Sequence, residues 1–190
     1  MEKRSLGARA LVFPTPVIIV GTYDANGRPN GMPATWGGVC CSDPPSIAVS
    51  IRADNYSYDN IKLHGCFTAS IPSERYMVET HYMGLASGRD NNKFESLSLT
   101  PSRAEYVNAP LVEEFPVSIE CRLSQTIELG SHTQFIGVVL DVKADIAVLD
   151  TQGEPDIALI KPLVFDPAKR RYFGLGAPLS KASALSRRMD

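Results

Sequence analysis

Residues 13–61 decide the fold, and they read FPTPVIIVGTYDANGRPNGMPATWGGVCCSDPPSIAVSIRADNYSYDNI. The run Val17–Tyr23 is apolar and rich in β-branched side chains, and the Asn26-Gly27 dipeptide behind it suits the positive φ angles of a tight hairpin turn. The returning limb, Pro29–Trp36, contains two prolines and a glycine. Because proline cannot donate a ladder hydrogen bond, this limb is predicted to be an edge strand or an irregular segment with free backbone groups.

A second strand is predicted for Ile47–Arg52, where apolar and polar side chains alternate up to the cation. The Asp54–Tyr58 segment then begins a helix, with Asp54 or Asn55 as its N-cap. A cation at a strand end, next to hydroxyls and unpaired N–H groups at a helix start, supplies what a phosphate monoester needs. The same residues also fit a solvated arginine, a capping serine and two surface tyrosines, so the segment alone leaves both interpretations open.

The rest of the chain predicts a mainly β fold with peripheral helices. Residues 74–83 carry apolar side chains at helical spacing, with Ser73 as the N-cap. Strand-like alternation follows, which indicates an antiparallel meander or barrel. The alternating segments are residues 114–123, 125–129, 133–142 and 146–149, with short extended segments at 160–165 and 171–176. Residues 177–190 are expected to form a short helix or a frayed tail.

Length and composition bound the class of protein. The chain has 190 residues, 44% of them hydrophobic, which suits a single domain over residues 1–190. The formal net charge is −2 and no basic tract is present, which argues against nucleic acid or an anionic membrane as the main partner. The N-terminal apolar run is short, is broken by prolines and leads to no cleavage site, so a cytoplasmic location is expected.

The four cysteines, Cys40, Cys41, Cys66 and Cys121, lack paired spacing and accompany only three histidines. Free thiols and no metal site are therefore expected. Cys40 and Cys41 are adjacent, and in an extended strand one would face the core and the other the outside, which admits a redox role. The favoured interpretation is that these small residues fill tight space.

Other nucleotide and nucleophile motifs are missing from the sequence. Residues 174–179 read GLGAPL and begin like a dinucleotide fingerprint, but the third glycine is absent and a proline intrudes. A Rossmann site is therefore excluded. A Walker-type phosphate loop and a Gly-x-Ser-x-Gly elbow are also absent.

Several further segments occur in a fixed order along the chain. They are residues 67–73 (FTASIPS), 84–90 (GLASGRD) with Lys93-Phe94, Leu99-Thr100-Pro101, Ala109-Pro110 and 128–137 (ELGSHTQFIG). Together with residues 14–52 and the following YSYDNI, they resemble the flavin reductase-like, FMN-binding split-barrel family over roughly residues 7–176. The resemblance implies a split β-barrel, an antiparallel barrel of the Greek-key type, with FMN as its cofactor.

The resemblance also implies a set of cofactor-binding residues. They are Asn30, Ala34, Thr35, Trp36, Ser50, Arg52, Ser57, Tyr58, Lys93, His132 and Phe165. Residues 30–36 match a strand that lies along the flavin, although Trp36 also suits a core anchor. Arg52 and residues 56–58 match the region of the phosphate and ribityl chain, with Ser57 at the place of a small hydroxyl. Phe165 matches an aromatic side chain near the ring.

Lys93 and His132 match polar contacts that come from distant parts of the chain. Reduction of a flavin places negative charge on its N1 and C2-carbonyl edge, and cations or N–H donors stabilise that charge. Both residues therefore suit either this edge or the phosphate. Without the resemblance, Lys93 would be an ordinary surface lysine and His132 a strand-end histidine with a local hydrogen bond.

The function implied by the resemblance is an FMN-dependent oxidoreductase in which the flavin itself carries the chemistry, so no catalytic side chain is assigned. The donor is NAD(P)H, laid transiently against the exposed face of the flavin, or a small redox protein. The alternatives are a non-catalytic FMN carrier or ligand-binding interaction module, and an unrelated β domain without a cofactor. The family's pairing of two chains implies a homodimer, to which Trp36 and Tyr58 contribute.

Overall fold

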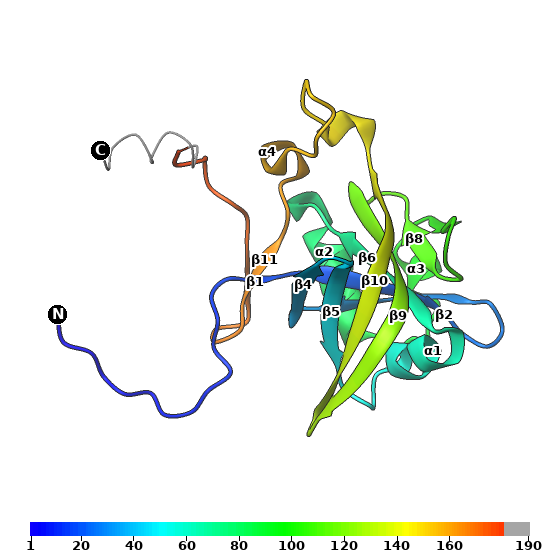
Figure 1. The fold of residues 1–190 in the computed structure, drawn as a ribbon, viewed down its shortest axis with the longest axis horizontal. Helices are drawn as coiled ribbons and strands as arrows, with labels where there is room; N and C mark the ends of the chain where they lie inside the picture. Colours follow the sequence, from blue (N-terminus) through cyan, green and yellow to red (C-terminus); the bar gives the residue numbers. More distant parts are fainter. Residues whose placement is uncertain (181–190) are drawn as a thin grey trace.

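The computed structural model describes residues 1–180, and its centre is a seven-stranded antiparallel sheet (Figure 1). The mainly β architecture with peripheral helices is confirmed. In spatial order the strands are β3 (Pro29–Ala34), β2 (Ile18–Tyr23), β6 (Cys66–Ile71), β9 (Val117–Leu129), β10 (His132–Ala144), β5 (Pro45–Ile51) and β4 (Gly37–Ser42). The limb that contains two prolines, β3, is an edge strand as predicted, because a central strand would need the two missing N–H donors.

The sheet rolls up on itself around one hydrophobic core. Ile18 on β2 and Val49 on β5 lie in the same buried cluster, although three strands (β6, β9 and β10) lie between β2 and β5 in the order of the sheet. Phe67 on β6 and Phe135 on β10 fill the middle of this cluster and are fully buried. Strands β4 and β2 also approach each other closely, because a Cβ atom on Gly37 would lie 3.3 Å from Cδ1 of Ile18. The interior is therefore that of a barrel rather than of an open sheet.

Helices cover the outside of the barrel near β3. Helix α1 (Tyr56–His64) follows β5 directly, begins at Asn55 and ends at Gly65, which adopts the left-handed conformation. The 3-10 helix η1 (Glu74–Tyr76) leads into α2 (Met77–Leu85), and α3 (Lys93–Ser96) lies beside it. A second buried cluster, which includes Ile19, Met83 and Phe94, joins the outer face of β2 to α2 and α3. The small hairpin of β7 (Pro101–Arg103) and β8 (Pro110–Val112) completes this side.

Both ends of the described chain extend away from the same side of the barrel (Figure 1). Strand β1 (Thr15–Pro16) pairs with β11 (Val164–Asp166), which pairs with β12 (Arg171–Phe173) in a separate three-stranded sheet. Helix α4 (Ile157–Ile160) precedes this sheet. The expectation of a helix or frayed tail for residues 177–190 falls largely on 181–190, outside the described residues.

Two details of the predicted secondary structure are wrong. Residues 114–123 and 125–129 are not two strands, because β9 continues from Val117 to Leu129 and forms one long hairpin with β10. The predicted strand at 146–149 is instead the 3-10 helix η2 (Ile146–Val148), which Asp145 caps by accepting a hydrogen bond from the backbone of Ala147. Aspartate competes well for helix starts, and this cap overrides the apolar alternation.

The packing interpretation of the cysteine pair is also wrong. Cys40 and Cys41 are both exposed on the edge strand β4, whereas Cys66 and Cys121 are buried. A register shift between Val39 and Cys41 shows that β4 bulges here, so the pair does not alternate between core and outside as a regular strand would. Burial raises the pKa of Cys121 to about 12, so this thiol stays protonated.

Within residues 1–180, none of the helices combines the length and the apolar character that crossing a bilayer requires. That part of the chain also lacks any group of three or more metal-ligating side chains.

Candidate functional site

A groove made of two adjoining cavities runs along β3. The first cavity, the Lys93 lobe, has a volume of about 180 Å³ and is lined by Asn30, Met32, residues 54–57, residues 83–88 and Lys93. The second, the Arg52 lobe, has a volume of about 200 Å³ and is lined by residues 32–36, Ser50, Arg52, Asn55, Gly84 and His132. The lobes share Met32, Asn55 and Gly84, so they form one elongated site.

The groove exists because β3 is an edge strand. No strand of the described part of the chain pairs with its outer edge, so the helix start after β5 and the loop after α2 can approach it. Nine of the eleven predicted cofactor-binding residues line the two lobes. They are Asn30, Ser57 and Lys93 in the first, and Ala34, Thr35, Trp36, Ser50, Arg52 and His132 in the second.

Lys93 is a buried cation at the end of the groove. Its side chain is 3% exposed, and Nζ donates to the carbonyl oxygens of Met83 at 2.7 Å and Gly31 at 2.9 Å. Among the described residues no carboxylate forms an ion pair with it. Because burial disfavours the charged ammonium, the pKa of Lys93 falls to about 8. An electron-rich group of a ligand would stabilise a buried ammonium that has no acidic partner, so Lys93 marks a candidate binding position.

Asn30 lies in the same lobe and holds an unsatisfied atom. Its Nδ2 donates to Oγ of Ser57 at 2.9 Å, across the start of α1. Its Oδ1 is buried and has no hydrogen-bond partner among residues 1–180. A buried carbonyl of this kind costs about 1–3 kcal/mol unless a donor reaches it. The lobe therefore brings a cation and an unsatisfied acceptor together, which suits a ligand edge with both a carbonyl and an N–H group.

The Arg52 lobe combines cationic and hydroxyl groups. Arg52 is 57% exposed at its side chain and pairs with Asp54 at 3.2 Å. Ser50 and Thr35 add hydroxyls to the lining. His132 comes from the start of β10, with its ring centroid 4.6 Å from that of Trp36. This lobe suits an anion that accepts several hydrogen bonds.

Two predicted residues do not line the groove. Tyr58 turns toward the barrel core, where its ring meets Phe135 edge-on at 5.4 Å. It lies one residue past Ser57 on α1, so its side chain leaves on another face of the helix. Phe165 lies on β11 and packs against Tyr172 at 5.1 Å, within the small sheet near the chain ends.

The structure adds residues that the sequence left unassigned. They are Met32, Asn55, Met83, Gly84, Ser87 and Gly88. The segment 84–90 was part of the matched order of motifs, which was a signal for a role in the site. The place of this segment in the groove depends on contacts between parts of the chain that are distant in sequence.

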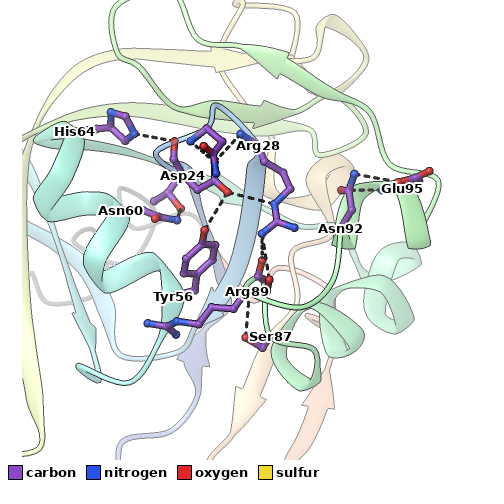
Figure 2. Close-up of polar contacts among 12 residues, drawn as sticks. Asp24, Arg28, Tyr56, Asn60, His64, Ser87, Arg89, Asn92 and Glu95 are labelled. Atoms are coloured by element: carbon purple, nitrogen blue, oxygen red, sulfur yellow. Dashed lines mark hydrogen bonds and ion pairs between the residues drawn. The ribbon is translucent and has the colours of Figure 1, made fainter.

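One polar network ties three segments around the Lys93 lobe (Figure 2). Oδ1 of Asp24 accepts the backbone N–H groups of Asn26 at 2.8 Å and Arg28 at 2.9 Å, and Oδ2 accepts the hydroxyl of Tyr56 at 3.0 Å. Burial alone would raise the pKa of Asp24, but these hydrogen bonds and the Arg28 guanidinium together hold it below its usual value. Asp24 is therefore a charged residue, 3% exposed, at the base of the hairpin turn.

Comparisons with known proteins show what the chain is similar to. A family model described as the flavin reductase like domain matches residues 9–175. The flavoredoxin of Desulfovibrio vulgaris (Miyazaki F) is 50% identical, with a TM-score of 0.93 over 97% of this chain and 100% of that one. The predicted resemblance to the flavin reductase-like family is thus confirmed.

Two further similar proteins concern the fold and the length of the proteins in which such a region occurs. A split-barrel domain structure from Shewanella frigidimarina is 22% identical, with a TM-score of 0.80 over 89% of this chain and 85% of that one, and it confirms the split barrel. The high molecular weight rubredoxin of Moorella thermoacetica is 31% identical over 152 residues, 79% of this chain. That match spans only 63% of the rubredoxin protein.

Proposed function

Because the chain belongs to the flavin reductase-like family, we propose that it is an oxidoreductase that holds FMN in the two-lobed groove and passes electrons through it. The bound flavin supplies the redox chemistry, and the protein supplies position and electrostatics. One observation carries the proposal. The same lobe contains the buried ammonium of Lys93, which has no acidic partner among the described residues, and the unsatisfied Oδ1 of Asn30.

This pair matches the pyrimidine edge of a flavin. Its carbonyl oxygens accept hydrogen bonds, which suits the ammonium of Lys93, and its N3–H group donates, which suits Oδ1 of Asn30. A phosphate monoester is mostly a dianion at neutral pH and then has no donor, so it would leave Oδ1 of Asn30 unsatisfied. Lys93 and the N-terminus of α1 also stabilise negative charge on this edge when the flavin is reduced.

The Arg52 lobe would then hold the phosphate end. Arg52 supplies charge, and Ser50, Thr35 and His132 surround the same space. Ser57 was expected beside Arg52, but it lies in the Lys93 lobe, hydrogen-bonded to Asn30. In this proposal Ser57 therefore positions Asn30 for the ring and does not contact the phosphate.

Two classes of electron donor fit the proposal. One is NAD(P)H, which would approach the exposed side of the flavin, since neither lobe carries a nucleotide-binding motif of its own. The other is a small redox protein, and the relative named a high molecular weight rubredoxin supports this class, because it joins the same type of domain to a longer chain. We favour the redox protein on that observation.

A homodimer is also part of the proposal. Large apolar side chains at positions 12–13 and 36–39 have more exposure than a free surface favours: Val12 at 70%, Phe13 at 58%, Trp36 at 41% and Val39 at 81%. A mostly apolar cleft of about 400 Å³, lined by residues 9–12, 14–16 and 35–37, shares Thr35 and Trp36 with that lobe. A second copy that covers these residues would also offer a route for Phe165 to reach a groove, namely that of the other chain.

The exposed thiols Cys40 and Cys41 suit a reducing compartment, which supports the proposed cytoplasmic location.

The decisive experiment is reconstitution followed by anaerobic reduction. Protein freed of flavin is mixed with FMN, and binding is followed by quenching of flavin fluorescence. The holoprotein is then mixed anaerobically with NADH, NADPH or reduced rubredoxin while bleaching of the flavin is recorded. Failure to take up FMN would refute the proposed cofactor. Bound flavin that none of the three donors bleaches would favour the carrier function instead.

A further inference from the structure

The strongest unexplained feature is a set of charged groups that surround the groove without lining it. Asp24 and Arg28, which we call the hairpin brace, belong to the turn between β2 and β3 and line neither lobe. Yet the guanidinium of Arg28 reaches across 60 residues of sequence to the loop after α2. Buried or half-buried charges with such long-range partners require a structural or functional reason.

Each group of the brace holds a different wall of the Lys93 lobe (Figure 2). Nη2 of Arg28 donates to the carbonyl oxygen of Gly88 at 2.8 Å and to that of Arg89 at 3.3 Å. Nε of Arg28 meets Oδ2 of Asp24 at 3.3 Å, and the same carboxylate oxygen accepts the hydroxyl of Tyr56. The hairpin turn thus fixes both the loop that contains Gly88 and the start of α1, which contains Tyr56.

Arg89 closes the same arrangement from the outer side. Its Nη2 donates to Asp59 at 2.8 Å and its Nη1 to the carbonyl oxygen of Asp54 at 3.0 Å. Its guanidinium carbon lies 5.1 Å from the centroid of the Tyr56 ring. The loop is therefore bound to α1 as well as to the hairpin, although Arg89 itself is exposed.

The wall that the brace holds leaves little space at Gly88. A Cβ atom on Gly88 would collide with Oδ1 of Asn30 and lie 2.9 Å from Cδ1 of Tyr56. Gly88 is buried, and it packs directly on the amide whose Oδ1 lacks a partner. A shift of the Gly88 backbone would therefore alter the position of Asn30 and of the aromatic wall together.

We propose that Asp24 and Arg28 are positioning residues for the flavin ring: they hold Gly88 and Tyr56 so that Asn30 and Lys93 meet the ring edge in one fixed geometry. The identity of the ligand rests on the proposed function, but the brace itself is a property of the protein alone. Neither residue lines a lobe of the groove, so the effect passes through the loop and α1.

The test compares Arg28→Met, which removes the donors, with Arg28→Lys, which retains one charged donor. Arg122→Met, an exposed arginine on β9, is the matched control. We expect Arg28→Met to bind FMN at least about 10-fold more weakly, Arg28→Lys to recover most of the loss, and Arg122→Met to match the wild type. The visible circular dichroism of bound FMN should change in Arg28→Met, because the ring is no longer held in one geometry.

A second readout needs no flavin. Trypsin cleaves after Arg89, and the brace binds the carbonyl oxygen of that residue. In flavin-free protein, cleavage at Arg89 should be several-fold faster in Arg28→Met than in the wild type, as followed by mass spectrometry. Unchanged cleavage would overturn the brace even if the wild type failed to bind FMN, which would separately refute the proposed function.

Gly88→Ala tests the wall rather than the brace. The added methyl group leaves Arg28 and Asp24 intact but must displace Asn30 or Tyr56. We expect FMN affinity to fall at least about 10-fold with the far-ultraviolet spectrum unchanged. Wild-type affinity in Arg28→Met would overturn the proposal, and wild-type affinity in Gly88→Ala would overturn the role of the Gly88 wall in it.

Discussion

The ammonium of Lys93 lies 2.7 Å from the carbonyl oxygen of Met83, which places a positive charge in the last turn of α2. A cation is favoured there by the helix dipole, and this contact offsets part of the cost of burial. The carbonyl contacts leave the charge itself unneutralised, however, because no acidic side chain of the described residues pairs with it. The positive charge of Lys93 is therefore available to stabilise an electron-rich group of a ligand.

Removal of this charge should weaken flavin binding. Lys93→Met keeps the length of the side chain and removes the donor, and we expect the dissociation constant for FMN to rise about 10-fold or more. The midpoint potential of the bound flavin should become more negative, because negative charge on the reduced ring loses its partner. Fluorescence titration and potentiometry measure the two effects. Lys169→Met, which changes an exposed lysine, is the control, and equal affinity of the two variants would contradict the role of Lys93.

The pKa of Lys93 predicts two pH effects of opposite sign. In the flavin-free protein the pKa is about 8, whereas the unfolded chain has the ordinary value of 10.5. The unfolded state therefore binds more protons between these values, and the free energy of unfolding should rise with pH in that window, by on the order of 1–3 kcal/mol. FMN binding requires the ammonium, so affinity should fall above pH 8 by up to about 10-fold per pH unit. Urea unfolding and titration against pH test this, and both trends should vanish in Lys93→Met.

The two lobes should be separable with FMN and riboflavin, which differ only by the phosphate. Arg52→Ala is expected to weaken binding of FMN about 10-fold and to leave riboflavin unaffected, because Arg52 lines only the phosphate end. Ser57→Ala should weaken both ligands alike, since it releases Asn30 in the other lobe. Parallel fluorescence titrations give the four ratios. A loss of riboflavin affinity in Arg52→Ala would reverse the proposed orientation.

How far the site can be predicted from sequence depends on the distance between its parts. The edge position of β3 follows from Pro29 and Pro33, because the reason is local: each lacks an N–H donor. Lys93 and His132 came only from the resemblance, since no local pattern brings them to β3. Arg52 and Ser57 are five positions apart in sequence, yet they line different lobes, because Asn55 at the start of α1 lies between and borders both.

Other features that the sequence did not predict also depend on how distant segments pack. Contacts such as Arg28 to Gly88 depend on how the hairpin turn and the loop after α2 pack, which no motif spacing encodes. The exposure of Cys40 and Cys41 depends on β4 being an edge strand, and edge position is a property of the whole sheet. The small size of the two cysteine side chains favoured burial, but the edge position of β4 leaves both of them exposed.

The cysteines should divide into two classes on titration. Cys40 and Cys41 are exposed and should react rapidly with a thiol reagent in the native protein. Cys66 and Cys121 are buried, with the pKa of both thiols raised by burial, and should react only after unfolding. Because β4 carries the pair away from the groove lining, replacing both by Ser should leave anaerobic flavin reduction unchanged. Slower reduction in that variant would restore the redox hypothesis.

Phe165 offers a test of whether two chains build one site. Within one chain it packs on Tyr172 and lies outside both lobes, so a role near the ring requires the groove of a second chain. We expect Phe165→Ala to weaken FMN binding in dimers, and we expect mixing it with Lys93→Met to restore tight sites. In a mixed dimer, the groove of the Phe165→Ala chain keeps Lys93 and receives an intact Phe165 from the other chain, while the second groove carries both defects. Co-refolding followed by titration should therefore show a fraction of sites with wild-type affinity, whereas each variant alone shows none. If each Phe165 served its own groove, every site in the mixture would stay defective, and a monomer by sedimentation would exclude the shared arrangement altogether.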